Sequence, residues 1–270
     1  MSAVWPVDEW VSWLRGRGRA ASTARLRRYQ LLAAAEDFGV PAAAVTPEQV
    51  ITRITRTHLA AETRRSQLSA LRSFYRWAVK AELVPADPTT DLRVPETDPN
   101  PRPAEDSLIL AAIARSDRPV ALMLQLGALC GMRRAEIARV HSRDITRSGL
   151  GWVLSVRGKG DKTRKVPVPD AGLARAVVDA GGWLFPSPVR PGLPLTAGNV
   201  GVRLRRALIS ATAHQLRHRY ATTVHRLTGD LLAVQRLLGH KSPTTTQRYI
   251  AGDDARMHAA ARAAMQWGAA

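Results

Sequence analysis

Four short patterns in the second half of the chain combine residue types that can act on a phosphate ester. In chain order they are Gly131-Met132-Arg133-Arg134-Ala135-Glu136, Gly158-Lys159-Gly160-Asp161-Lys162-Thr163-Arg164, His214-Gln215-Leu216-Arg217-His218 and Leu238-Gly239-His240, with Tyr249 nine residues beyond His240. Each pattern alone has an ordinary explanation, such as a solvated arginine, a polar helix face or a packing tyrosine. The ordered set is much harder to obtain by accident, and it indicates a single chemistry.

These residue types suit the cleavage of a phosphodiester by side chains alone. A pentacoordinate phosphorus carries extra negative charge on its non-bridging oxygens, and the guanidinium groups of Arg133 and Arg217 can donate paired hydrogen bonds there. Imidazole from His214 and His240 can donate or shuttle protons near neutral pH. The Tyr249 hydroxyl has an ordinary pKa of about 10, so it needs a neighbouring imidazole and cations to attack as a phenolate.

Attack by a tyrosine on DNA would leave a 3′-phosphotyrosine and a free 5′-hydroxyl. The covalent intermediate stores the bond energy, so rejoining needs no ATP. The 5′-oxygen is a poor leaving group as an alkoxide, and Lys159 on a glycine-flanked tip is the natural acid, with Lys162 as the alternative. The sequence has no acidic cluster suited to two Mg²⁺ ions and no glycine-rich phosphate loop. We therefore expect no metal and no cofactor.

The composition favours a nucleic-acid partner. The chain has 270 residues, with 40 Lys and Arg against 22 Asp and Glu, for a net charge of +18. Three of its five lysines fall within the Gly158 to Lys165 stretch, against 35 arginines. Cys130 is the only cysteine, which excludes an internal disulfide and fits a reducing cytoplasm. No apolar run is long enough to span a bilayer, and no signal peptide is evident, so we expect a cytoplasmic protein without a membrane partner.

A proline-rich stretch, VPETDPNPRPAED from Val94 to Asp106, predicts two domains. We place a helical domain at 1–95, a linker at 96–105 and a second domain at 106–270. The first contains the clearest helix, 62–84, with a row of basic and hydroxyl residues beside its apolar stripe: Arg65, Ser69, Arg72 and Arg76. That row is either a solvated face or a grip on DNA phosphates.

The second domain must bring the four patterns together. A helix at 120–129 ends near Gly131, and another begins at about Arg133. Alternating apolar residues around the Gly158-Lys159-Gly160 stretch predict a β-hairpin with Lys159 at its tip. Further helices are predicted at 212–227, 231–238 and 243–251, with a short alanine-rich helix at 254–267 after them.

Together these motifs resemble those of the tyrosine recombinases, the phage integrase family. The ordered signature of arginine, hairpin lysine, His-x-x-Arg, Gly-His and tyrosine covers about 133 to 249, and the helical first half resembles the family's core-binding domain more weakly. The resemblance favours Arg133 over Arg134 and Lys159 over Lys162, and it gives Glu136 the family's acidic position that orients a basic catalytic group.

The resemblance also implies an architecture. It predicts a mainly α protein with a small β-sheet, in which a helical core-binding domain and a mixed α/β catalytic domain form a C-shaped clamp. It implies a homotetramer on two short double-stranded DNA core sites, with a possible directionality factor. The DNA-binding residues expected are Arg65, Arg72, Arg76, Lys162 and Arg164.

Several biological roles remain open at this point. Helical patterning begins by about Val7, so we expect a minimal recombinase without an arm-binding domain, most simply an integrase of a phage or mobile element. A Xer-type resolvase of chromosome or plasmid dimers is the main alternative. A type IB topoisomerase would use similar residues as a monomer, and a non-enzymatic DNA-binding regulator would leave Tyr249 unexplained.

Overall fold

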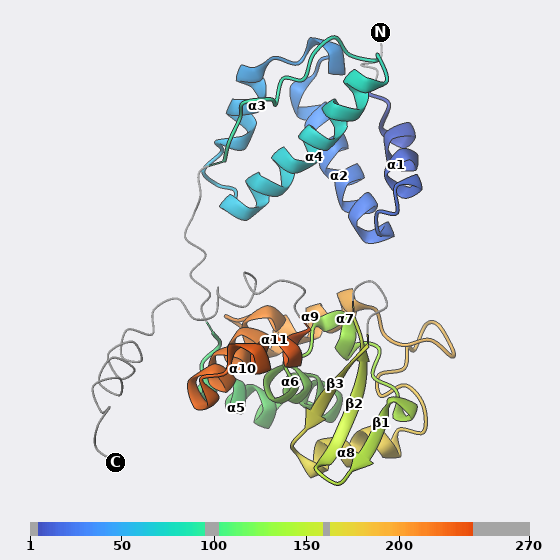
Figure 1. Ribbon diagram of the computed structural model, residues 1–270, viewed down its shortest axis with the longest axis vertical. Helices are drawn as coiled ribbons and strands as arrows, with labels where there is room; N and C mark the ends of the chain where they lie inside the picture. The colour runs from blue at the N-terminus through green and yellow to red at the C-terminus, as the bar shows by residue number, and fades with distance from the viewer. Residues whose placement is uncertain (1–4, 95–102, 159–162, 240–270) are drawn as a thin grey trace, which may run out of the picture. The chain divides into compact units, whose positions relative to one another are not determined.

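The structure, a computed structural model, describes residues 5–94, 103–158 and 163–239 (Figure 1). The chain divides into two compact units, Met1–Asp98 and Pro99–Ala270. The division falls within the proline-rich stretch. Each unit has its own hydrophobic core. Among the described residues, no helix combines the length and apolar character needed to cross a membrane.

The first unit is a helical bundle of α1 (Val7–Gly16), α2 (Ala21–Phe38), α3 (Pro47–Ile54) and α4 (Ala61–Lys80). Its core is rich in aromatic rings: Trp10 and Phe74 are fully buried and meet edge to face at 5.7 Å. The sequence Thr46-Pro47-Glu48-Gln49 predicts a capping box at the start of α3, and the structure confirms it, because Thr46 and Gln49 exchange side chain to backbone hydrogen bonds.

Helix α4 ends four residues before the predicted 84. Glu82 adopts a left-handed φ of 56°, and the amides of Glu82 and Leu83 donate back to the carbonyls of Val79 and Ala78. This is the hydrogen-bond pattern of a Schellman motif, which closes a helix by satisfying its last carbonyls. The apolar periodicity of the sequence continues past Lys80 because Leu83 and Val84 follow the turn. Periodicity alone therefore does not reveal where the helix ends.

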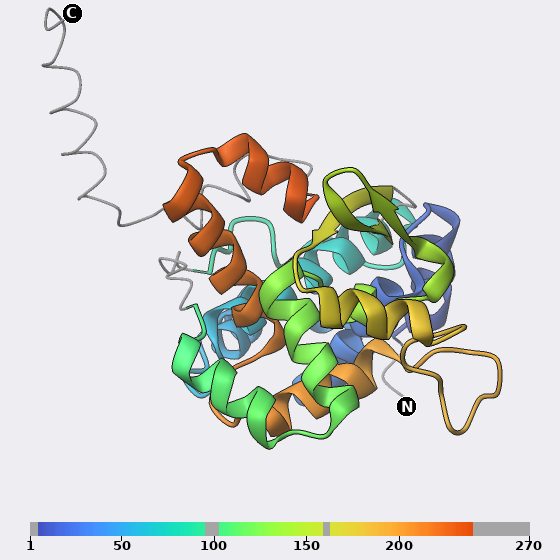
Figure 2. The same ribbon diagram turned by 90° about the horizontal axis from the view of Figure 1, so that it is seen from below.

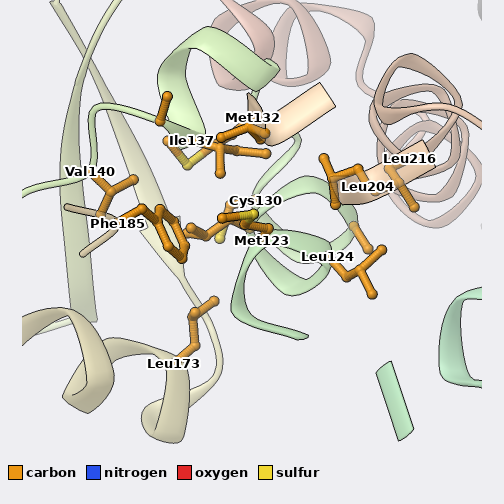
Figure 3. Close-up of a cluster of buried hydrophobic side chains, with 14 of the residues drawn as sticks. Met123, Leu124, Cys130, Met132, Ile137, Val140, Leu173, Phe185, Leu204 and Leu216 are labelled. Carbon is orange, nitrogen blue, oxygen red and sulfur yellow. The ribbon is translucent and has the colours of Figure 1, made fainter. Parts of the chain in front are cut away.

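The second unit surrounds helix α6 (Arg118–Cys130). This helix packs against α5 (Asp106–Arg115), α7 (Arg134–Ile137), α9 (Ala197–Leu208), α10 (Ala213–Thr228) and strand β3, and in Figure 2 it runs through the middle of the unit. Figure 3 shows the core around it, where Met123, Leu124 and Cys130 from α6 meet Leu216 from α10 and Leu204 from α9. Helices α8 (Ala171–Asp179) and α11 (Leu231–Leu238) complete the unit.

A small antiparallel sheet lies beside these helices, in the order β1 (Ile145–Ser148), β2 (Gly151–Arg157) and β3 (Thr163–Val168). The predicted hairpin corresponds to β2 and β3, paired in register from Trp152 with Val168 to Arg157 with Thr163. Strand β1 was not predicted: only Ile145 in it is buried, so it has no alternation to detect. The mainly helical fold class with a small sheet is confirmed.

Candidate active site

Arg133 lies where two helices meet. Helix α6 ends at Gly131, whose φ of 59° is left-handed. Arg133 is then the N-cap residue of the short helix α7. The side chain of Tyr220, from α10, packs directly against Gly131, so that a Cβ atom added there would meet Tyr220 Cδ1 at 2.4 Å. Only glycine fits this turn without strain, and the turn sets the position of Arg133 two residues later.

Glu136 is the centre of a buried group of arginines. Its carboxylate accepts hydrogen bonds from the Arg133 backbone and guanidinium at 2.8 Å each. Both of its oxygens also accept from Arg164 at 2.8 Å, and a terminal nitrogen of Arg217 lies 3.9 Å away. Burial alone would raise the pKa of Glu136, but hydrogen bonds and charge from Arg164, with further hydrogen bonds from Arg133, outweigh it and lower the pKa to about 2. Glu136 is therefore a carboxylate at any physiological pH.

Arg217, on α10, is held by the carboxyl ends of two other helices. Its side chain is 2% exposed. One terminal nitrogen donates to the Gly131 carbonyl and the other to the Leu238 carbonyl, both at 2.6 Å. Carbonyls at the ends of helices carry partial negative charge, which suits a buried cation. Residues far apart in the sequence thereby fix one guanidinium plane.

His214 stands one turn before Arg217 on α10, whose N-cap is Thr212. Burial, and then the charges of Arg217 and Arg133, lower the pKa of His214 below its usual value of 6.5, so its imidazole is neutral near pH 7 and can accept a proton. His218 packs edge to face against it at 4.2 Å, and burial, followed by the electrostatic effects of His214 and Arg217, lowers the His218 pKa to about 4. His218 is thus a neutral packing partner of His214.

Arg133, His214 and Arg217 border one hollow of about 430 Å³. It is lined by Arg133, Arg134, Gly201, Arg205, Thr212, Ala213, His214 and Arg217. Arg133, with 40% of its side chain exposed, is the accessible member of the group around Glu136. The hollow is cationic and polar, as a site for a phosphodiester should be. The sequence patterns did not include Arg205, from α9, because it lies in none of the four motifs.

Four predicted site residues lie outside the described residues: Lys159, Lys162, His240 and Tyr249. The described chain fixes the points from which their segments start. Arg157 and Thr163 pair across the base of the hairpin that carries the two lysines. Gly239 closes α11 with a φ of 65° and directly precedes His240.

Arg164 occupies a place different from the DNA-contacting surface predicted for it. It is only 11% exposed, donates both terminal nitrogens to Glu136, and donates Nε to the Leu237 carbonyl at 2.9 Å. Arg164 does not line the hollow that Arg133 and Arg217 border, and three of its nitrogens are engaged by protein acceptors in a buried position, so the geometry favours a positioning role over the predicted phosphate contact. Sequence patterns alone do not reveal this, since Arg164 directly follows the stretch that carries the two candidate lysines.

The predicted basic row of α4 borders a second hollow, wholly within the first unit. Ser69, Arg72 and Arg76 line it, whereas Arg65 is half-buried and lies 3.7 Å from Glu62. Three arginines that the sequence analysis did not select line it too: Arg17, Arg19 and Arg27. Burial, and then the charge of Arg19, lower the pKa of Arg27, so the like charges here are crowded. A polyanion would relieve that repulsion.

Known proteins resemble this chain over most of its length. The model of the phage integrase family matches residues 103–256. A tyrosine recombinase XerC of Xanthomonas axonopodis pv. citri (strain 306) is 31% identical over 244 residues, which cover 79% of this chain and 78% of that protein. A XerC of Alcanivorax borkumensis is 32% identical over 217 residues, covering 70% and 68%.

Solved structures show the same fold. A lambda integrase dimer bound to a COC′ core site has a TM-score of 0.72 at 19% identity, covering 90% of this chain and 75% of that one. A XerH recombinase in a post-cleavage complex with a palindromic difH substrate has a TM-score of 0.71 at 19% identity, covering 93% and 84%. With a family model that matches more than half of its residues, this chain belongs to the phage integrase family, the tyrosine recombinases that cut and rejoin DNA.

Proposed function

We propose that this recombinase cleaves DNA through Tyr249, with Arg133 and Arg217 stabilising the non-bridging oxygens of the attacked phosphate. The observation that carries the proposal is the buried Glu136 carboxylate, which holds Arg133 by two hydrogen bonds at the edge of the polar hollow. Preorganised donors of this kind stabilise developing charge without having to reorganise during the reaction.

The proton movements follow from the proposed roles. As Tyr249 Oη bonds to phosphorus, its proton passes to a base, and the neutral imidazole of His214 is suited to accept it. As the bond from phosphorus to the 5′-oxygen breaks, Lys159 protonates that oxygen. His240 is a second donor to the phosphate. Rejoining reverses these steps, so that no net bond is lost and no cofactor is consumed.

The test for the nucleophile is a nicked suicide substrate, which traps the 3′-phosphotyrosine. Tyr249→Phe should bind DNA with unchanged affinity and salt dependence but form no SDS-resistant adduct. Tyr29→Phe, at an exposed tyrosine of α2, is the matched control and should behave as wild type. An adduct in Tyr249→Phe would move the nucleophile elsewhere. Tyr220 is a poor second choice, because burial raises its pKa to about 12.

The biological role is a separate proposal. A phage or mobile-element integrase is the role first expected from the sequence, but the curated relatives reported above are XerC proteins, and this favours the alternative of a Xer-type resolvase. A cell-based assay distinguishes them. A resolvase converts plasmid or chromosome dimers to monomers at a site in its own genome. An integrase instead joins two different attachment sites, one of them beside its gene.

The assembly is proposed from the states in which a similar recombinase has been solved. A lambda integrase has been solved as a dimer on a core site and as a tetramer bound to a Holliday junction. We accordingly propose double-stranded DNA as the partner and a homotetramer as the active complex in the cytoplasm. Analytical ultracentrifugation with a core-site duplex tests the tetramer. A complex of four chains with two duplexes has a far greater mass than one chain, or two chains, on a single duplex.

A further inference from the structure

Arg164 connects three parts of the site that are far apart in the chain. It lies near the start of β3, immediately after the hairpin tip that carries Lys159. Its terminal nitrogens donate to both oxygens of Glu136, which also holds Arg133. Its Nε donates to the carbonyl of Leu237, in the last turn of α11. A planar guanidinium can satisfy these three acceptors at once because its donors are fixed in direction.

The end of α11 is the part of this network that bears on the proposed nucleophile. Arg217 donates to the Leu238 carbonyl at 2.6 Å and Arg133 approaches it at 3.4 Å. Gly239 follows with a left-handed φ, and a Cβ atom added to it would meet Arg164 Cδ at 2.9 Å. Arg164 therefore fixes the position of the last turn of α11 both by a hydrogen bond and by direct packing.

We infer that Arg164 is a positioning residue that sets the end of α11, and with it the start of the segment leading to His240 and Tyr249, relative to Arg133 and Arg217. The inference rests on the proposed role of Tyr249. A positioning role and a phosphate contact predict different results. If Arg164 is a positioning residue, its loss slows the cleavage of bound DNA and leaves the affinity for DNA unchanged. Misplacing reacting groups by about 1 Å costs roughly 100-fold in rate.

Arg164→Lys is the first variant to test, because lysine keeps the charge but cannot hold both Glu136 oxygens and Leu237 together. Arg175→Ala, at an exposed arginine of α8, is the control for removing a surface charge. At saturating DNA, we expect adduct formation on the suicide substrate to fall roughly 10- to 100-fold in Arg164→Lys. The dissociation constant and its salt dependence should match wild type.

Gly239→Ala supplies an independent variant in case Arg164→Lys does not fold. It displaces the Arg164 stem from the opposite side, so it should show the same loss of rate with normal DNA binding. Gly181→Ala has a similar left-handed φ of 60° but open space around it, and it controls for backbone strain alone. A melting temperature measured for each variant shows that the assays are done on folded protein.

The outcomes separate the two proposals. If wild type forms no adduct, or Tyr249→Phe still forms one, the proposed function fails, whatever Arg164 does. If wild type forms the adduct and Arg164→Lys matches its rate, only the positioning role is wrong. If Arg164→Gln, which removes the charge, weakens DNA binding and lowers the salt slope by about one while Arg175→Ala does not, Arg164 is a phosphate contact, as first predicted.

Discussion

Replacing Gly131 with alanine tests whether the turn between α6 and α7 controls the site. Two costs are expected. A left-handed φ costs a residue with a Cβ atom about 1 kcal/mol relative to glycine. The Cβ atom would also lie 2.4 Å from Tyr220 Cδ1 and 2.9 Å from its Cε1, and forcing atoms into a packed core costs about 1–3 kcal/mol.

Gly181→Ala isolates the second cost. Gly181 has almost the same φ, 60° against 59°, but no atom lies within 4 Å of the position of its Cβ. The difference in the free energy of unfolding between the two variants should therefore be about 1–3 kcal/mol. For a unit of this size each kcal/mol lowers the melting temperature by about 2–4 °C. Gly131→Ala should thus melt about 2–12 °C below Gly181→Ala.

Scanning calorimetry of the whole chain measures this difference, followed on the transition of the second unit. The same variant should lose adduct formation at temperatures where it is folded, because the Gly131 carbonyl accepts a hydrogen bond from Arg217. Equal melting temperatures for the two variants would refute the packing argument. Normal cleavage by folded Gly131→Ala would refute the claim that this carbonyl positions Arg217.

Three further predictions concern charge. The pKa of Glu136 is about 2 in the folded protein against an ordinary 4.5, so its contribution of about 3 kcal/mol to the free energy of unfolding is complete above pH 4.5 and is lost as the pH falls toward 2. Thermal melts of Glu136→Gln should lack this part of the acid destabilisation. Profiles of melting temperature against pH that run parallel in the variant and wild type would contradict the prediction. Arg76→Ala should lower the slope of DNA affinity against salt by about one. Arg25→Ala, at an exposed arginine of α2, is the control and should leave the slope unchanged. Equal slopes for the two variants would show that the first-unit hollow does not contact DNA. Lys159→Ala should slow cleavage by about 10²- to 10⁴-fold. A substrate with sulfur in place of the 5′-bridging oxygen should restore the rate of this variant, since a thiolate leaves without an acid. If sulfur restores the rate of Lys162→Ala instead, Lys162 is the acid.

Local rules in the sequence predicted the elements well where the signal is itself local. The capping box at Thr46 and the closure of α11 at Gly239 both depend on residues within one turn, and the structure confirms both. The family, its chemistry and the mainly helical fold class were also accessible, because the order and spacing of the motifs are properties of the sequence alone. The proposed roles of Lys159, His240 and Tyr249 rest on that order.

What only the tertiary structure decided is which polar residues face each other. From sequence, Arg164 belongs to a hairpin tip and Arg217 to a helix face, but the fold buries both against Glu136 and the carbonyl ends of α6 and α11. In the first unit, the end of α1 and the first half of α2 bring Arg17 and Arg27 to the row on α4. Such contacts join residues dozens of positions apart, and they are set by how the cores pack. Helical periodicity shows which face of a segment is buried, but the neighbour on that face depends on the whole fold.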